Sequence, residues 1–134
     1  MDKWIQLQSE NGEDNLYPIG KMDLLWVNSS TSSAFASQTI SIDLSEYNMV
    51  YVTAGWSKSS ANSYLGYVTL VGDRGIINGI GTTKIYREYQ ATTTGVVFGT
   101  GQYASAGGTS LSNNSDYAIP WRIYGIKLKT DDVR

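Results

Sequence analysis

Residues 37–44 read S-Q-T-I-S-I-D-L, and residues 49–56 read M-V-Y-V-T-A-G-W. In the first stretch, Ile40, Ile42 and Leu44 alternate with polar residues, so one face of a β-strand would be buried and the other wet. The second stretch is apolar on both faces, which is typical of a strand in the middle of a sheet. Together the two stretches predict a β-sheet domain.

The flanking sequence repeats this pattern at intervals of about 8–12 residues, with turn residues between the apolar runs. Further strands are predicted at residues 22–27, 64–71, 82–91, 95–98 and 117–128, with a short strand at 76–77 that Asn78-Gly79 interrupts. No stretch shows the sustained apolar spacing of a helix. About eight strands of this kind predict an all-β fold, an antiparallel β-sandwich of the jelly-roll type.

The chain is predicted to have two parts. Residues 1–20 form an extended neck segment, because Asn11-Gly12 is a strong turn dipeptide and Pro18 keeps the residue before it extended. Residues 21–134 form the β-sandwich head domain. Within the head, residues 99–114 are rich in Gly, Ser and Asn, which predicts a long polar loop with an exposed tyrosine at its centre.

Composition excludes several classes of function. The chain has no Cys and no His, which excludes disulfides, the usual zinc sites and Ser-His-Asp catalysis. The formal net charge is -2 and the pI is about 4.9, which argue against binding to nucleic acid or to an anionic membrane. Neither a membrane helix nor a signal peptide is expected, since no apolar run is long enough and the N-terminus lacks an apolar core.

Cofactors and metals are not expected either. The run G-T-G-Q-Y-A at residues 99–104 lacks the following helix that a dinucleotide site requires. The acidic residues Glu10, Glu13 and Asp14 lack the spacing of a calcium-binding loop, which favours a solvated turn over a cation site.

Aromatic and small polar side chains remain as the candidate ligand-binding groups. Gly, Ser, Thr and Asn make up 50 of the 134 residues, alongside 10 Tyr and 4 Trp. Sugar rings pack their apolar C–H face on Trp or Tyr, while their hydroxyls bond to Asn, Asp and Ser. The predicted ligand-binding residues are Trp56, Asn62, Tyr64, Tyr103, Asn113 and Asp116. Trp26 and Trp121 lie inside apolar runs and are predicted core residues, whereas Trp56 fits the core and a ligand site equally well.

Paired carboxylates offer a competing, enzymatic interpretation. A glycoside hydrolase needs two carboxylates about 5–10 Å apart across a cleft. The candidates are Asp43, Glu46, Asp73, Glu88 and Asp116. Only Glu88 is flanked by aromatic residues in a strand, and a surface ion pair with Arg87 explains its position equally well. No catalytic residue is therefore assigned, and a non-enzymatic protein is expected.

Three parts of the sequence resemble tail proteins of phages and prophages of Gram-positive bacteria. The first, N-G-E-D-N-L-Y-P at residues 11–18, looks like the segment that leads into the receptor-binding heads of tail fibres and baseplate proteins. The second comprises L-L-W-V-N-S-S at 24–30, F-A-S-Q-T-I at 35–40 and D-L-S-E-Y at 43–47. The third, I-P-W-R-I-Y-G-I-K at residues 119–127, is similar to the C-terminal ending of minor tail proteins.

The resemblance implies a receptor-binding head at the tip of a tail fibre, minor tail protein or baseplate protein, often a homotrimer, that binds host cell-wall saccharide. It implies a location in the virion tail after synthesis in the bacterial host cytoplasm, with the N-terminus joined to the rest of the fibre. Residues 57–114 match nothing in these proteins, whose middle usually holds the variable loops that face the ligand. Two other functions stay open: a structural tail-tip module without a ligand, and a carbohydrate-binding module or depolymerase fragment of a bacterial enzyme.

Overall fold

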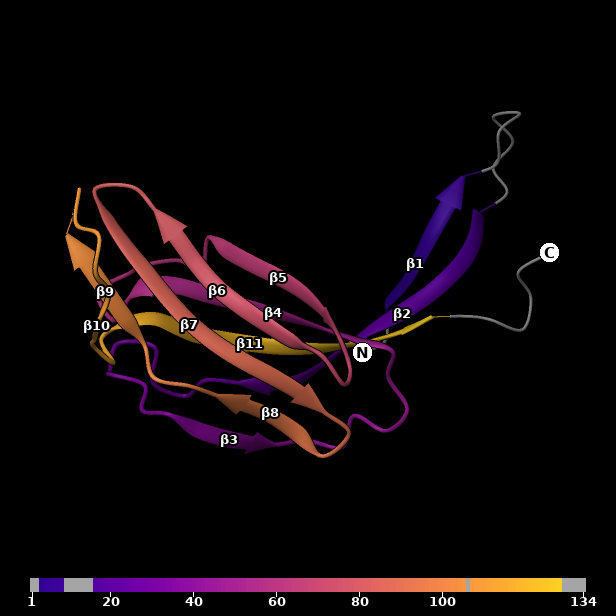
Figure 1. The fold of residues 1–134 in the computed structure, drawn as a ribbon. Helices are drawn as coiled ribbons and strands as arrows, with labels where there is room; N and C mark the ends of the chain where they lie inside the picture. The colour runs from indigo at the N-terminus through magenta and orange to yellow at the C-terminus, as the bar shows by residue number, and fades with distance from the viewer. Residues whose placement is uncertain (1–2, 9–15, 106, 129–134) are drawn as a thin grey trace.

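The computed structural model describes residues 3–8, 16–105 and 107–128, with side chains from residue 20 onward. All regular secondary structure in these residues is β-strand (Figure 1). The strands, in chain order, are β1 (Lys3–Gln8), β2 (Leu16–Val27), β3 (Gln38–Ser41), β4 (Met49–Ser57), β5 (Leu65–Leu70), β6 (Arg74–Ile80), β7 (Thr83–Thr92), β8 (Gly95–Phe98), β9 (Gln102–Ser105), β10 (Ser112–Asn113) and β11 (Tyr117–Leu128).

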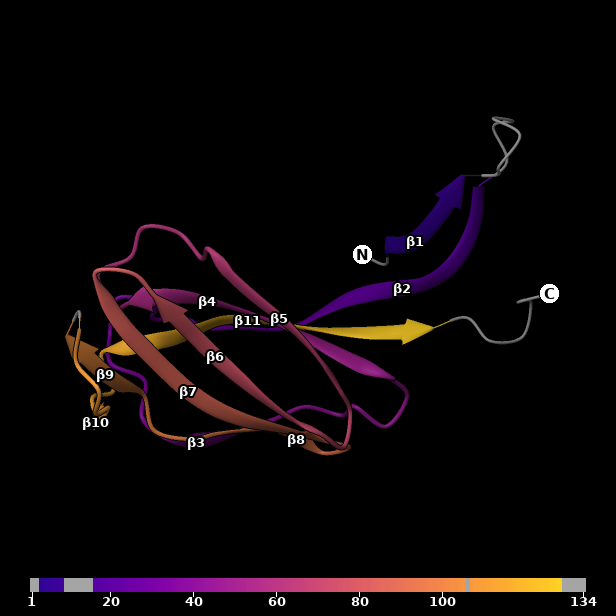
Figure 2. The ribbon, with the colours of Figure 1, turned by 45° about the horizontal axis from the view of Figure 1, so that its top comes forward.

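Two antiparallel sheets face each other. The first has the order β1-β2-β11-β4-β5, and the second has the order β10-β9-β7-β8-β3, with β6 paired to the other edge of β7. Figures 1 and 2 show the second sheet lying over the first. The predicted all-β antiparallel sandwich is confirmed, with eleven strands in the described residues where about eight were predicted.

The strand at residues 49–57, β4, has the central position that its sequence predicts. It lies between β11 and β5, and Val50, Val52 and Ala54 on its inner face are fully buried. Its outer face is half-buried rather than covered, at Met49 and Tyr51 among others. Both faces of β4 are apolar, but only its inner face is fully buried, and its outer face stays partly open to solvent.

An aromatic cluster fills the space between the sheets. The Phe35 ring stands edge-on to the Phe98 ring, with 5.4 Å between their centroids, and Trp26 and Tyr89 contact the same Phe98 ring. Phe35, Tyr89 and Phe98 are buried. The two tryptophans predicted for the core, Trp26 and Trp121, are half-buried and pack against this core.

The alternating stretch that predicted the first strand keeps its alternation but not its full length. Leu44 is buried and Ile40 and Ile42 are half-buried, as the pattern predicts. The regular strand β3 nevertheless ends at Ser41. Beyond it, Ile42 and Leu44 donate backbone hydrogen bonds to the turn after β7 instead of continuing a ladder.

Two loop predictions are wrong. Asn78-Gly79 lies inside the continuous strand β6, because residues 74–80 all pair with β7. The Tyr67 hydroxyl from β5 also bonds both the carbonyl and the N–H of Asn78. Residues 99–114 contain the paired strands β9 and β10. Tyr103 is half-buried rather than exposed, since its ring stacks on Tyr117 with 4.5 Å between centroids and 25° between planes.

The predicted neck, residues 1–20, contains β1 and the first part of β2. These pair antiparallel, and β2 then continues into the first sheet to pair with β11. Figure 2 shows β1 and the start of β2 projecting away from the sandwich. A role as a neck stays a prediction.

Arg87 is fully buried, so the predicted surface ion pair with Glu88 is wrong. The alternation of β7 points Arg87 into the sandwich and Glu88 out to solvent. Arg87 Nε donates to the carbonyl oxygen of Ala118 at 2.7 Å, Nη1 to that of Gly99 at 2.7 Å and Nη2 to that of Tyr117 at 3.0 Å. Its guanidinium thereby joins the two sheets.

The backbone of β11 is shaped around this guanidinium. Ala118 has a φ of 53°, in the left-handed region, which costs a non-glycine residue about 1–2 kcal/mol. Successive carbonyls of an extended strand point in opposite directions. The left-handed conformation at Ala118 instead lets the carbonyls of Tyr117 and Ala118 both accept hydrogen bonds from the Arg87 guanidinium. Burial lowers the pKa of the Arg87 guanidinium to about 10, so it stays charged at neutral pH.

We predict that Arg87→Met lowers the free energy of unfolding by about 3 kcal/mol. The methionine fills part of the space but leaves three carbonyls, one buried and two partly buried, without the donors that Arg87 supplies, at a cost of about 1 kcal/mol or more each. Urea unfolding followed by tryptophan fluorescence measures the change. Arg74→Met, at an exposed arginine of β6, is the control and should change stability by less than about 0.5 kcal/mol. Equal effects of the two substitutions would contradict this account of Arg87.

Candidate functional site

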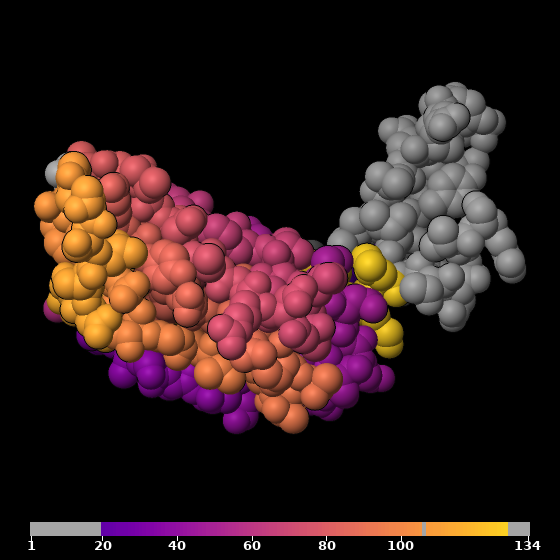
Figure 3. Space-filling model, viewed as in Figure 1, coloured from indigo at the N-terminus to yellow at the C-terminus, as the bar shows by residue number. Residues whose placement is uncertain are grey.

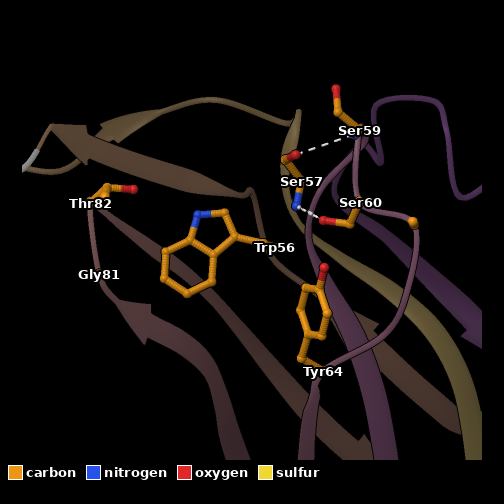
Figure 4. A pocket seen from close by; sticks show the side chains of 8 residues that line it. Trp56, Ser57, Ser59, Ser60, Tyr64, Gly81 and Thr82 are labelled. Carbon is orange, nitrogen blue, oxygen red and sulfur yellow. Dashed lines mark hydrogen bonds between the residues drawn. The ribbon is translucent and has the colours of Figure 1, made fainter.

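An open hollow of about 600 Å³ lies where β4 ends (Figure 4). It is lined by Trp56, Ser57, Ser59, Ser60, Ala61, Tyr64, Gly81 and Thr82. These residues come from the end of β4, the loop that follows it and the turn between β6 and β7. Figure 1 shows this end of β4 and this turn away from the end where β1 and β2 project.

Trp56 reaches from the first sheet to the second. Its Nε1 donates to the Thr83 Oγ1 at 2.9 Å, which fixes the ring over the β6–β7 turn. A Cβ atom at Gly79 would overlap the Trp56 ring, whereas one at Gly81 would lie 3.6 Å from it, in ordinary contact. Gly79 therefore does not form a turn but allows the Trp56 indole ring to approach the backbone closely. The indole nitrogen already donates its one hydrogen bond to Thr83.

The serine loop beside Trp56 is held by its own hydrogen bonds. The Ser57 N–H donates to the Ser60 Oγ at 3.0 Å, and the Ser59 N–H donates to the Ser57 Oγ at 3.2 Å (Figure 4). The Lys58 N–H donates to the Asp116 carbonyl at 2.8 Å, and the Lys58 Nζ lies 3.4 Å from the Asp116 carboxylate. The loop is thus fastened to the segment that precedes β11.

Tyr64, which follows the serine loop, also borders the hollow. Its side chain is 67% exposed. Figure 4 shows its phenol ring and the Trp56 indole bordering the same space, with the Tyr64 hydroxyl on the side of the serine loop. Asn62 is exposed and lies between the lining residues Ala61 and Tyr64, without lining the hollow itself.

The other three predicted ligand-binding residues do not line this hollow. Tyr103 stacks on Tyr117, Asn113 accepts a hydrogen bond from the Gln102 Nε2 at 3.2 Å, and Asp116 pairs with Lys58. Each has a partner that holds the β9–β10 corner or the serine loop in place. The structure therefore divides the predicted set into Trp56 and Tyr64 in the hollow, Asn62 beside it, and three residues that support neighbouring segments.

Several lining residues escape prediction from the sequence. Ser57, Ser59 and Ser60 lie in the polar stretch S-K-S-S-A-N-S at residues 57–63, which contains no binding motif, and Gly81 and Thr82 come from a segment about 25 positions further along the chain. The available signal was Asn78-Gly79, because a glycine next to a strand pattern also marks a close approach of another group.

None of the candidate carboxylates lines the hollow, although Asp116 pairs with Lys58 in the serine loop beside it. No residue that lines it carries a carboxylate or a cation. Asp43 accepts hydrogen bonds from the Ser45 hydroxyl at 2.6 Å and the Ser45 N–H at 3.0 Å, which lower the pKa of its carboxyl. Glu88 accepts a hydrogen bond from the Tyr86 hydroxyl at 2.9 Å on the outer face of the second sheet.

No metal site is formed in the described part of the chain, where no group of three or more Asp and Glu side chains is placed to hold a metal ion. The predicted turn with Glu10, Glu13 and Asp14 lies outside the described residues. The same part of the chain contains no helix that could span a membrane.

Comparison of the chain with protein families, with curated proteins and with solved structures gives no match.

We predict that Gly79→Ala lowers the free energy of unfolding by about 1–3 kcal/mol, because the added methyl group displaces the Trp56 ring from its packed position. Gly81→Ala, whose methyl group meets the same ring at an ordinary distance, should change stability by less than about 0.5 kcal/mol. Urea unfolding of both variants measures the difference. Equal stability of the two variants would show that Trp56 is not held against Gly79.

Proposed function

We propose that this chain is a non-enzymatic saccharide-binding domain that forms the receptor-binding tip of a phage tail fibre or baseplate protein. The observation that carries the proposal is the hollow in which Trp56 and Tyr64 border one space beside a loop of serine hydroxyls. A saccharide needs both kinds of surface, since its C–H face packs on aromatic rings and its hydroxyls require polar partners.

The details of the hollow favour an uncharged ligand. The indole nitrogen of Trp56 already donates to Thr83, which leaves the ring carbons as the contact surface. Tyr64 offers both an exposed ring and a hydroxyl, and the serine side chains offer further hydroxyls. Because the lining residues carry no charge, binding would depend little on ionic strength.

The position of the hollow fits a tail tip. Its lining residues come from the end of β4, the loop after it and the β6–β7 turn. This end of β4 and this turn lie away from the projecting strands β1 and β2 (Figure 1). If the chain joins the fibre through its N-terminus, as the resemblance to tail proteins implies, the hollow faces outward toward the host cell. This supports a location in the virion tail and a host cell-wall saccharide as the partner.

A single open site of this kind binds weakly, with a dissociation constant of about 1 mM, which corresponds to a binding free energy of roughly 4 kcal/mol. Several linked copies raise the avidity by about 10²–10⁴, provided that they engage the surface at once. A shallow site is therefore sufficient for adsorption when the domain is multivalent.

Self-association is the second part of the proposal, in the form of a homotrimer. The outer face of the first sheet carries two apolar rows that cross four strands: Leu24, Tyr124, Tyr51 and Val68, then Met22, Ile126, Met49 and Leu70. Leu24, Val68 and Leu70 are each about half exposed. Because these rows carry no charge, copies of the chain meet there without like-charge repulsion, which favours a second copy over a charged partner.

We predict that Tyr64→Ala weakens binding to saccharide by about tenfold without unfolding the domain, since the exposed ring supplies contact area to the ligand and little to the core. The measurement is binding of fluorescently labelled protein to a panel of Gram-positive cells, with competition by their purified wall polysaccharides. Tyr64→Phe keeps the ring and is the matched variant, which should retain most of the binding. Wild-type binding by folded Tyr64→Ala would contradict the proposed site.

We predict that the protein has three times the 14.7 kDa mass of one chain in solution. Light scattering coupled to size-exclusion chromatography measures this mass. Val68→Lys, which places a charge on the apolar rows, should shift the mass toward that of a single chain. The control Ile76→Lys, at a similarly exposed apolar residue of the second sheet, should leave it unchanged. A single-chain mass for the folded wild-type protein would overturn the trimer.

A further inference from the structure

A second recessed surface lies on the outer face of the second sheet, away from Trp56. It consists of two adjoining hollows that share Glu88 and Gly99. One is also lined by Tyr86, Thr100, Gln102 and Leu111, and the other by Arg74, Tyr89, Gln90 and Val97. The two hollows together are called the β7 groove below. Figure 3 looks onto the face formed by β6 to β9 that carries it.

Strand β7 forms the floor of the β7 groove. Its residues alternate, so that Ile85, Arg87 and Tyr89 are buried while Tyr86 and Glu88 face outward. Gln90, the next outward residue, pairs with Arg74 of β6 and with Val97 of β8. At about 3.4 Å per residue, Tyr86 and Gln90 lie roughly 14 Å apart, which is longer than one sugar ring.

The polar groups of the β7 groove are set for hydroxyl ligands. The Tyr86 hydroxyl donates to the Glu88 Oε1 at 2.9 Å, and this bond raises the pKa of the Tyr86 phenol, which keeps it a neutral donor. Within the described residues, neither Glu88 nor Arg74 forms an ion pair. The second carboxylate oxygen of Glu88 is thus free to accept from ligand hydroxyls, and Arg74 is free to donate to them.

We propose that the β7 groove is a second binding site, which holds several consecutive sugar units of a neutral, linear saccharide chain along β7. Val97 and Leu111, each about 40% exposed, and the ring of Tyr86 give apolar surface for the C–H faces of the sugars. Glu88 and Arg74 carry opposite charges that offset each other across the groove, so an uncharged polymer is favoured over an anionic one. The choice of saccharide rests on the proposed function, whereas the groove itself does not depend on the hollow at Trp56.

The two sites predict different dependence on ligand length. The hollow is bordered by two rings and accepts a short unit, such as a chain end. The β7 groove gains contacts with each further unit that lies along the strand. Long fragments should therefore lose more affinity than short ones when the groove is altered.

The test uses the neutral polysaccharide extracted from Gram-positive cell walls, in long and short fragments, with isothermal titration calorimetry on the whole chain. Glu88→Gln keeps the shape of the side chain and removes its charge, and Tyr86→Ala removes the ring. Each should weaken binding of long fragments by about tenfold and leave short fragments within about twofold. Thr93→Ala, at an exposed turn outside both hollows, is the control and should bind both fragments as the wild-type protein does.

The outcomes separate the two proposals. Loss of long-fragment affinity in both groove variants supports the β7 groove, whatever Tyr64→Ala does. If both folded groove variants bind long fragments with wild-type affinity, the proposal of a site in the β7 groove is overturned. The proposal of a site in the hollow is then tested by Tyr64→Ala alone. If only the groove variants lose affinity, the proposed hollow is overturned and the groove is the saccharide site. Absence of binding by the wild-type protein to either fragment overturns both.

Discussion

Three hydrogen bonds from one buried guanidinium join the two sheets of this sandwich. Arg87 of β7 holds the carbonyls of Tyr117 and Ala118 at the start of β11, and the carbonyl of Gly99 after β8. Backbone carbonyls cannot be removed by mutation, so a donor is required wherever they are buried. With the start of β11 fixed, Asp116 is in place to hold Lys58 and, through it, the serine loop.

The hollow depends on a second long-range contact, between Trp56 and the β6–β7 turn. The indole ring fits only because Gly79 has no side chain, and its direction is set by Thr83. The Trp56 ring is thus positioned by groups of the opposite sheet, whereas the serine loop is held by Asp116 beside β11 of its own sheet. An aromatic surface held in this way is preorganised, which reduces the entropy lost when a ligand binds.

The parts of the fold that follow local alternation were predictable from the sequence. The inward-facing residues Ile40, Ile42 and Leu44 are examples, because period-two patterning directly reflects one buried face. The failures at Asn78-Gly79, Arg87 and Tyr103 share one cause, since each residue is explained by a partner far along the chain. Of the candidate site, Trp56 and Tyr64 were identifiable as aromatic residues flanking a polar loop, whereas Gly81 and Thr82 join the hollow only through the tertiary fold.

The central claim is that saccharide binds against the Trp56 and Tyr64 rings, and an NMR titration tests it most directly. The ¹⁵N–¹H spectrum of the protein would be followed as oligosaccharide fragments of Gram-positive wall polysaccharide are added. The account predicts shifts of the Trp56 indole N–H and of backbone amides in the serine loop and the β6–β7 turn. Saccharide binding that leaves these signals unmoved would contradict it.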